Sequence, residues 1–391
     1  MRILLVIHEK LNPNSGSAGS TWRMGQEYQK LGHEVTYYSF DDLPKKFSPV
    51  AKEVLFPLYV AAYINKIMAE QELDVVDAST GDLWLWAKVF RPLSKQKPLL
   101  VTRSHGLEHI MHLANKEDVA RKTMNFSWKY PFYRGSIQLW QVKQSLLDAN
   151  FVYLLSNQEK TYAIKELKVD SHKACVFPNG IPDSFLNLPI KPLTESESNL
   201  KIAVVSTFIP RKGINYSVPA LNKILKLYPQ IKVSFLGTEC RECPNPNSVY
   251  SRFDPEVKDR ITVVPRFNHE ALPQLLAGHQ IKILASLSEG FGKALVEAMA
   301  CGLVPIATNT SGPSDIITHH YDGILVPPRS IEAIEQALIE LIEDRVFLER
   351  LRGNAYNTAQ KYSWSKITED RLSVYFHGLY QKQCNQVEEM V

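Results

Sequence analysis

Two glutamates and two glycines in one short segment have the types and spacing that suit an elongated polar ligand. Glu289 precedes Gly290-Phe291-Gly292, and Glu297 lies two turns into an expected helix that opens at Lys293. The glycines let the backbone approach a ligand, and the unpaired amides that open a helix favour an anion such as phosphate. Carboxylates are strong acceptors for sugar hydroxyls. The segment predicts a site for a ligand with phosphate and hydroxyl groups; either glutamate taken alone is better explained as a solvated charge.

The loop with Glu289 belongs to a chain in which short apolar runs alternate with segments of helical spacing or composition. The first series of runs is 2–8, 34–39, 75–78, 98–102, 151–155 and 174–177. The second is 201–206, 231–237, 261–264, 281–285, 303–307 and 324–326. Continuous apolar strands separated by helices predict parallel sheets that are buried on both faces and doubly wound. We therefore expect an α/β protein with two such domains in tandem and a ligand at the strands' carboxyl ends, between the domains.

A turn cluster at 179–183 and a linker-like stretch at 188–199 separate the two series. The chain has 391 residues, a length that suits two domains of roughly 180 to 200 residues each. We place the boundary between residues 182 and 183, and we expect a final helix over 364–382.

Composition excludes several classes of protein. Hydrophobic residues make up 45% and charged residues 22%, which excludes a disordered or low-complexity chain. A net charge of +4 is too small for a dedicated nucleic-acid binder. No apolar stretch is long enough to span a bilayer, and the first residues fit a buried strand better than a signal peptide. Five scattered cysteines suit a reducing compartment, so we expect a cytoplasmic protein.

The segment Ser286-x-x-Glu289-Gly290-Phe291-Gly292-x-x-x-x-Glu297 resembles the E-x7-E signature of the retaining glycosyltransferases of family 4, also called glycosyl transferases group 1. Further matches follow in the family's order and cover most of the chain, more strongly in its second half. They are Phe177-Pro178-Asn179-Gly180-Ile181, Lys212-Gly213, Arg266-Phe267 with Leu272-Pro273, and Thr310-Ser311-Gly312 with Asp315.

This resemblance implies a GT-B fold, in which two Rossmann-like domains face a central cleft. The acceptor-side domain would comprise residues 1–182 and the C-terminal helix 364–391, because the last helix of GT-B proteins crosses back to the first domain. The linker and the nucleotide-sugar-binding domain would comprise residues 183–363. The implied reaction is metal-independent transfer of a hexose from a nucleotide diphosphate sugar to a hydroxyl acceptor, with no further cofactor. Polysaccharide, lipopolysaccharide or glycolipid assembly is the usual setting.

The resemblance also implies roles for single residues. Glu289 would accept hydrogen bonds from the donor sugar, and Glu297 would hold the ribose. The amides of Phe291, Gly292 and Lys293 would face the diphosphate or the sugar, with Gly290 beside them. Lys212 would stabilise the leaving phosphate, where negative charge grows during the reaction.

One position departs from the family's pattern. The family usually has an arginine where this chain has Thr207. Arg211 is a candidate replacement because a guanidinium suits phosphate geometry, and its alternative is a solvated loop residue.

Candidates in the first half lie in loops after expected strands. Gly16 and Gly19 belong to a loop before a helix that we expect to start near Ser20, and the resemblance makes both glycines cleft residues. His105 follows the strand at 98–102, where the family has a histidine next to the reacting sugar; an isolated histidine is otherwise more often structural. A metal site at His105, His109 and His112 would lack a carboxylate or cysteine partner, so we expect none. Cys240-x-x-Cys243 is interpreted as a loop feature.

The stretch 116–143 combines basic and aromatic residues, with six Lys or Arg against two acids. Such a segment can contact an anionic membrane at its inner face or a lipid-linked acceptor. The favoured interpretation is a loop and helix on the acceptor side whose aromatics pack inward.

Three hypotheses of function follow. The first is a retaining glycosyltransferase. The second is another enzyme on the same scaffold, such as a nucleotide-sugar epimerase or a phosphorylase. The third is a non-catalytic nucleotide-sugar binder, which Thr207 favours. The sequence does not determine the base, sugar, acceptor, linkage or oligomeric state.

Overall fold

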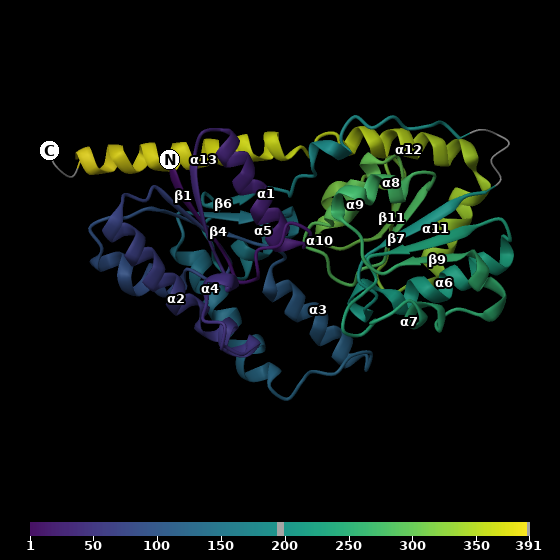
Figure 1. Cartoon of the computed structure of the whole chain (residues 1–391), viewed down its shortest axis with the longest axis horizontal. Coiled ribbons are helices and arrows are strands. Elements are labelled where there is room, and N and C mark those ends of the chain that lie inside the picture. The colour runs from purple at the N-terminus through teal and green to yellow at the C-terminus, as the bar shows by residue number, and fades with distance from the viewer. Residues whose placement is uncertain (194–198, 389–391) are drawn as a thin grey trace. The chain divides into compact units, whose positions relative to one another are not determined.

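The computed structural model describes residues 1–193 and 199–388, and the chain forms two compact α/β units. The first unit comprises Met1–Gly180 together with the C-terminal segment from Trp364, and the second comprises Ile181–Ser363. Figure 1 shows a sheet in each unit with helices on both of its faces.

The first unit contains a six-stranded parallel sheet in the order β2-β1-β3-β4-β5-β6. Its strands are β1 (Arg2–Ile7), β2 (Glu34–Ser39), β3 (Val75–Ser79), β4 (Leu99–Arg103), β5 (Phe151–Leu154) and β6 (Ala174–Val176). Its helices are α1 (Ser17–Lys30), α2 (Pro49–Glu70), α3 (Glu108–Ala120), α4 (Gln138–Asp148), α5 (Asn157–Lys165) and α13 (Trp364–Glu388). Alternate residues of β1 enter two cores: Leu4 packs with α2, and Ile3 packs with α1 and α13.

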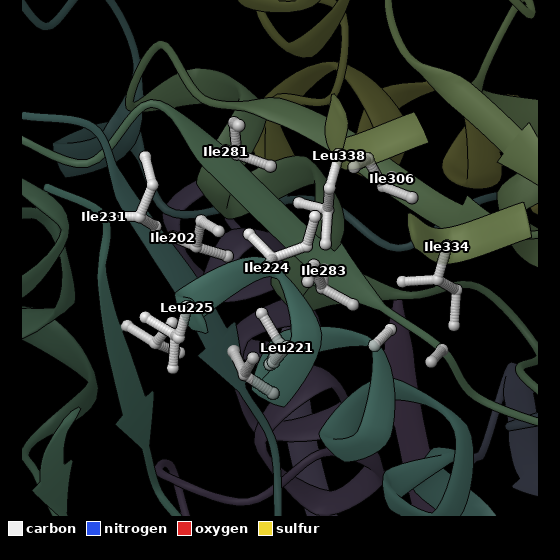
Figure 2. Close-up of a cluster of buried hydrophobic side chains, with 14 of the residues drawn as sticks. Ile202, Leu221, Ile224, Leu225, Ile231, Ile281, Ile283, Ile306, Ile334 and Leu338 are labelled. Carbon is white, nitrogen blue, oxygen red and sulfur yellow. The ribbon is translucent and has the colours of Figure 1, made fainter. Parts of the chain in front are cut away.

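The second unit repeats this architecture in the order β12-β11-β10-β7-β8-β9. Its strands are β7 (Lys201–Val205), β8 (Lys232–Leu236), β9 (Ile261–Val264), β10 (Ile281–Leu284), β11 (Val304–Thr308) and β12 (Ile324–Val326). Its helices are α6 (Ile214–Leu227), α7 (Asn247–Tyr250), α8 (Leu272–Leu276), α9 (Lys293–Ala300), α10 (Ser311–Ile316), α11 (Ile331–Glu343) and α12 (Arg345–Ala359). Figure 2 shows Leu221 and Ile224 of α6 and Leu338 of α11 packed against the sheet.

The predicted fold class is confirmed. Every predicted apolar run forms a strand whose bounds differ by no more than one residue from the prediction. The helix expected near Ser20 is α1, which begins three residues earlier, at Ser17.

In both sheets the strand order reverses at one position, the topological switch point. In the first sheet, β2 is added on one side of β1 and β3 on the other. In the second sheet, β8 is added on one side of β7 and β10 on the other. The carboxyl ends at such a switch point form the usual ligand site of doubly wound sheets. The functional residues are therefore expected after β1 and β3, and after β7 and β10.

The C-terminal helix α13 is part of the first unit's core. Tyr375 of α13 is fully buried, and its hydroxyl donates to the Asp77 carboxylate on β3. Arg103 at the end of β4 forms an ion pair with Asp77. Helix α13 thus completes a buried polar network under the carboxyl end of the first sheet. In the described part of the chain, no helix is both long and apolar enough to cross a membrane.

Candidate active site

An ion pair lies at the switch point of the second unit. The Lys212 Nζ is 2.7 Å from the Glu289 Oε2, and each side chain is 17% exposed. The buried Ser286 hydroxyl donates to the same oxygen over 3.1 Å. Burial favours a higher pKa for Glu289, but Lys212 and, less strongly, Arg211 and Ser286 hold its pKa below the ordinary value. Glu289 is therefore a carboxylate at neutral pH, and it accepts hydrogen bonds at the edge of the sheet.

The close approach of two loops creates this pair. Lys212 ends a short 3-10 turn, and Gly213 follows it with a φ of 74°. A Cβ on Gly213 would lie 1.8 Å from the carbonyl oxygen of Ala285, at the end of β10. The Leu287 amide also donates to the Arg211 carbonyl over 2.9 Å. Only glycine brings the lysine this close to the Glu289 loop.

The loop that carries Glu289 is fixed from its other side by the start of α10. The Glu289 carbonyl accepts from the Gly312 amide over 3.0 Å and from the Ser311 hydroxyl over 2.9 Å. A Cβ on Gly312 would lie 2.3 Å from the Phe291 carbonyl oxygen. The Thr310-Ser311-Gly312 motif therefore holds the loop in place.

Helix α9 begins directly after this loop. Gly292 is its N-cap residue, with a φ of 92°, and Lys293 is its first residue. The first amides of a helix have no partner within the helix, so this end suits an anion. Gly290 is half-buried, whereas Phe291 is buried and lies against the Tyr362 ring, with 5.7 Å between centroids. The amides expected to face a diphosphate thus follow Glu289 at the carboxyl end of β10.

Glu297 is buried and paired with a histidine. Its side chain is 2% exposed, and its Oε1 is 2.6 Å from the His269 Nε2. His269 is itself buried and lies beside the Phe185 ring. The sequence did not single out His269, which stands between the Arg266-Phe267 and Leu272-Pro273 matches. The structure therefore pairs Glu289 with Lys212 and Glu297 with His269.

Lys282 is a second residue that the sequence reasoning missed. Its side chain is fully buried in β10, and its Nζ donates to the carbonyls of Ile283 and Val205 over 3.0 and 3.4 Å. Burial, reinforced by the charge of Lys212, lowers the pKa of Lys282 to about 7. Its only signal was a lysine inside an apolar strand, which is a rare place for an unpaired charge.

Arg211 is exposed, and its side chain makes no hydrogen bond or ion pair within residues 1–193 and 199–388. It acts on Glu289 through its charge, because it contributes to the lowered pKa of that carboxyl. Thr207 is half-buried in the preceding loop. The structure thus brings a guanidinium near Glu289.

The candidates in the first unit lie in loops at the carboxyl edge of its sheet, except Gly19, which lies in the first turn of α1. His105 is half-buried, and its Nε2 is 3.2 Å from the Ser79 hydroxyl. Burial, followed by the charge of Arg103, lowers the pKa of His105 well below its usual value, so the imidazole is neutral at pH 7. Gly16 is the N-cap residue of α1, and Gly19 lies in the first turn. A Cβ on Gly19 would lie 2.7 Å from the Pro13 carbonyl oxygen, whereas Gly16 is open.

The basic and aromatic segment divides into two parts. Phe126 and Tyr130 stack on each other and on His112, as the prediction of inward packing requires. Trp128 and Phe132 do not follow that prediction, because they are 75% and 68% exposed. Among the described residues, no helix or strand covers the exposed rings of Trp128 and Phe132.

The cysteine pair forms a loop feature, as expected. Cys240 and Cys243 are free thiols joined by two backbone hydrogen bonds. Within residues 1–193 and 199–388, no three His, Cys, Asp or Glu side chains are grouped closely enough to hold a metal ion.

Comparisons with known proteins match nearly the whole chain. The family described as Glycosyltransferase Family 4 matches residues 14–185, and the family described as Glycosyl transferases group 1 matches residues 190–358. An Escherichia coli protein, UDP-Gal:alpha-D-GlcNAc-diphosphoundecaprenol alpha-1,3-galactosyltransferase, is 24% identical over 292 residues, which are 72% of this chain and 70% of that protein. A probable sucrose-phosphate synthase of Thermosipho melanesiensis is 26% identical over 315 residues, which cover 77% of this chain and 69% of that protein.

Two solved structures share the fold over almost their full length. Sucrose-phosphate synthase from Thermosynechococcus elongatus has a TM-score of 0.75 at 20% identity and covers 96% of this chain and 98% of its own. Anabaena HepE in complex with UDP has a TM-score of 0.70 at 17% identity and covers 96% of this chain and 99% of its own.

Proposed function

Because the chain belongs to the GT-B glycosyltransferases of the family 4 type, we propose that it transfers a hexose from a nucleotide diphosphate sugar to a hydroxyl acceptor with retention of configuration. The Lys212–Glu289 pair at the switch point of the second sheet carries this proposal. It places a cation and a hydrogen-bond acceptor together, as a ligand with both phosphate and sugar hydroxyls requires.

The chemistry assigns different tasks to the two side chains. Glycosyl transfer passes through an oxocarbenium-like state while negative charge grows on the departing phosphate. Lys212 and the first amides of α9 would stabilise that charge. Glu289 would accept hydrogen bonds from the donor sugar and exchange its bond with Lys212 for them. The sequence contains no Asp-x-Asp, so we propose that these groups provide the charge compensation without a metal ion.

Other residues would complete the donor site. Arg211 would approach the diphosphate in place of the missing arginine at Thr207, because its exposed guanidinium is free to move. Glu297 would reach the ribose only if a ligand displaced or shared its bond with His269. His105, as a neutral imidazole, would hydrogen-bond the reacting sugar. The similar structure of HepE contains UDP, which supports a nucleotide-sugar donor but does not determine the base for this chain.

A panel of nucleotide sugars tests the donor site. We expect one member among UDP, GDP, ADP, TDP and CMP sugars to raise the melting temperature by several degrees, since saturation at ~100 Kd adds about 2.7 kcal/mol. Lys212→Ala should remove the response. Lys223→Ala, which changes an exposed lysine on α6 of the same unit, should keep it. A full response in Lys212→Ala would refute the assignment.

Turnover is tested with the isosteric variant Glu289→Gln. With the responding donor and an acceptor extract, we expect transfer to fall by about 100-fold or more, on the scale of losing one transition-state hydrogen bond. Nucleotide binding should remain, because the phosphate contacts are unchanged. A wild-type protein that binds a nucleotide sugar but transfers it to no acceptor would favour the binder hypothesis, to which Thr207 points.

We also propose that the exposed part of the basic and aromatic segment contacts an anionic bilayer. Trp128 and Phe132 are amphipathic or apolar anchors, and Lys129 lies 5.3 Å from the centre of the Trp128 ring. Trp128→Ala with Phe132→Ala should abolish sedimentation with phosphatidylglycerol vesicles. Tyr380→Ala, which removes an equally exposed ring from α13, should not change it. If the Trp128→Ala, Phe132→Ala double variant sediments with the vesicles as well as the wild type does, this surface is excluded as a membrane contact.

A further inference from the structure

A polar cavity of about 430 Å³ lies within the first unit, and its volume falls in the range of small-molecule sites. It opens beside the loops that follow β1 and β3. The side chains used below come from the loops after β1, β2 and β3, from α2, from the segment before α4 and from the start of α4. They are His8, Phe40, Glu53, Asp82, Tyr133, Arg134 and Gln138.

His8 and Asp82 form a polar pair in the wall of this cavity. The His8 Nδ1 is 3.0 and 3.1 Å from the two carboxylate oxygens of Asp82. The His8 side chain is 33% exposed, whereas Asp82 is 5% exposed. No hydrogen bond of the His8 Nε2 is found within residues 1–193 and 199–388. The buried carboxylate therefore fixes the ring by one nitrogen and leaves the other for a ligand.

The electrostatic surroundings keep His8 a donor. Burial alone would lower the pKa of His8, but Asp82 and, less strongly, Glu108 and Glu9 raise it to about 9. Both ring nitrogens then carry a proton at neutral pH, so the Nε2 offers an N–H rather than a lone pair.

The position of the pair in the fold gives an independent indication of a ligand. His8 follows β1 and Asp82 follows β3, the two strands that flank the switch point of the first sheet. Lys212 and Glu289 hold the same place in the second sheet. Each doubly wound sheet thus has one pair of opposite charges at the site where its topology opens a crevice.

The cavity wall carries as many carboxylates as basic side chains, which indicates the kind of ligand. His8 is paired with Asp82, and the Arg134 guanidinium is 2.8 Å from the Glu53 carboxylate. A phosphate would have to compete with these carboxylates for His8 and Arg134, and the charge of the exposed Lys10 is offset in the same wall by Glu9. A neutral hydroxylated molecule can instead accept from the cations and donate to the carboxylates. Phe40 and Tyr133 add ring surface for the apolar faces of such a molecule.

We propose that this cavity binds a neutral sugar ring, with the His8 Nε2 donating to one of its oxygens and Asp82 positioning the imidazole. Resting on the proposed function, the ring is the terminal sugar of the acceptor. The acceptor class of this site is therefore a neutral saccharide end rather than a phosphorylated one.

Saturation-transfer NMR on the full chain tests the proposal directly. The probes are the methyl α-glycosides of glucose, galactose, mannose and N-acetylglucosamine, with glucose 6-phosphate and inorganic phosphate as anionic counterparts. We expect at least one glycoside to bind saturably and more tightly than both anions. His8→Gln should weaken it by about tenfold, as the loss of a charged donor predicts. His172→Gln changes an exposed histidine of the same unit and should not alter binding.

Three results would overturn the proposal: no glycoside binds, an anion binds best, or His8→Gln binds the glycoside as tightly as the wild type. If His8→Gln does not fold, Gln138→Leu carries the same test, because it replaces a polar wall residue by an apolar one. The nucleotide-sugar response is measured on each variant in parallel. If no protein, wild type included, gives a nucleotide-sugar response, the proposed function has failed. If the nucleotide-sugar response is present but no sugar binds, only the sugar-site proposal has failed.

Discussion

Lys282 provides a stability test that isolates one buried charge beneath the candidate site. Its folded-state pKa is about 7, against an ordinary value of 10.5. Because the folded pKa lies below the unfolded one, the unfolded chain binds more protons between these values. The free energy of unfolding therefore rises with pH across this window. This gain in stability is complete above the unfolded pKa, and it is lost as the pH falls toward about 7.

The magnitude follows from the two pKa values. Between about pH 7 and about pH 9 the unfolded lysine stays protonated, while the folded lysine goes from half protonated to neutral. The difference in bound protons, summed over this pH range, is about 1.7 pH units, which corresponds to about 2 kcal/mol in the free energy of unfolding. Lys282→Met keeps an unbranched side chain, one heavy atom shorter, and removes the titration. Its stability relative to the wild type should therefore fall by about 2 kcal/mol over this range.

Urea denaturation at the two pH values measures this effect. All six tryptophans lie in the first unit, so their fluorescence follows the unit that the substitution does not touch. Circular dichroism follows both units. Lost packing or hydrogen bonds would shift the variant's stability equally at both pH values, so only the pH-dependent difference reports the titration. If the two proteins have parallel profiles within about 0.5 kcal/mol, the reasoning about Lys282 is refuted.

Three further substitutions test how the sites are held. Gly213→Ala should abolish the nucleotide-sugar thermal shift, because its Cβ would collide with the Ala285 carbonyl; a normal shift would contradict the close loop approach. Gly312→Ala should lower transfer by more than about tenfold while the protein stays folded by circular dichroism, since the Phe291 backbone must move. Tyr375→Phe should lower the melting temperature of the first unit, followed by tryptophan fluorescence, because Asp77 loses a buried donor at a cost of about 1–3 kcal/mol; an unchanged value would place Asp77 in contact with water.

The fold was predictable because its signal is continuous along the chain. Buried parallel strands such as β7 and β10 consist almost entirely of apolar residues, and each is followed by a turn and a helix. Such runs can be recognised without knowing their neighbours. The start of α1 was less well defined, because Ser17, Ala18 and Gly19 suit both a loop and a first helical turn. Short-range patterns therefore determined the elements, and only their ends were misplaced.

The candidate site was predictable only where a motif named its residues. Glu289 and Lys212 are 77 residues apart, and the family resemblance suggests both of them without knowledge of their ion pair. Lys282 and His269 stand in ordinary positions of a strand and a loop, and their importance comes from burial beside Glu289 and Glu297. Burial and partnership across the chain are tertiary properties, so spacing alone could not find them. His8 was missed for the same reason, since its partner Asp82 lies 74 residues away.

The two switch-point pairs differ in a way that separates their tasks. Lys212 is a lysine ammonium, which suits a group that must stabilise a leaving phosphate throughout turnover. Under the proposed function, an anion that attracts the lysine would release its partner Glu289, so binding a donor would free the carboxylate for sugar hydroxyls. His8 is instead held as a cation by Asp82, and it becomes neutral above a pKa of about 9. Sugar binding to the first unit should then weaken above that pH in the wild type, while the nucleotide response of the second unit persists. Under the proposed function, the same topology would thus provide an electrostatic site for a charged donor and a hydrogen-bonding site for a neutral acceptor.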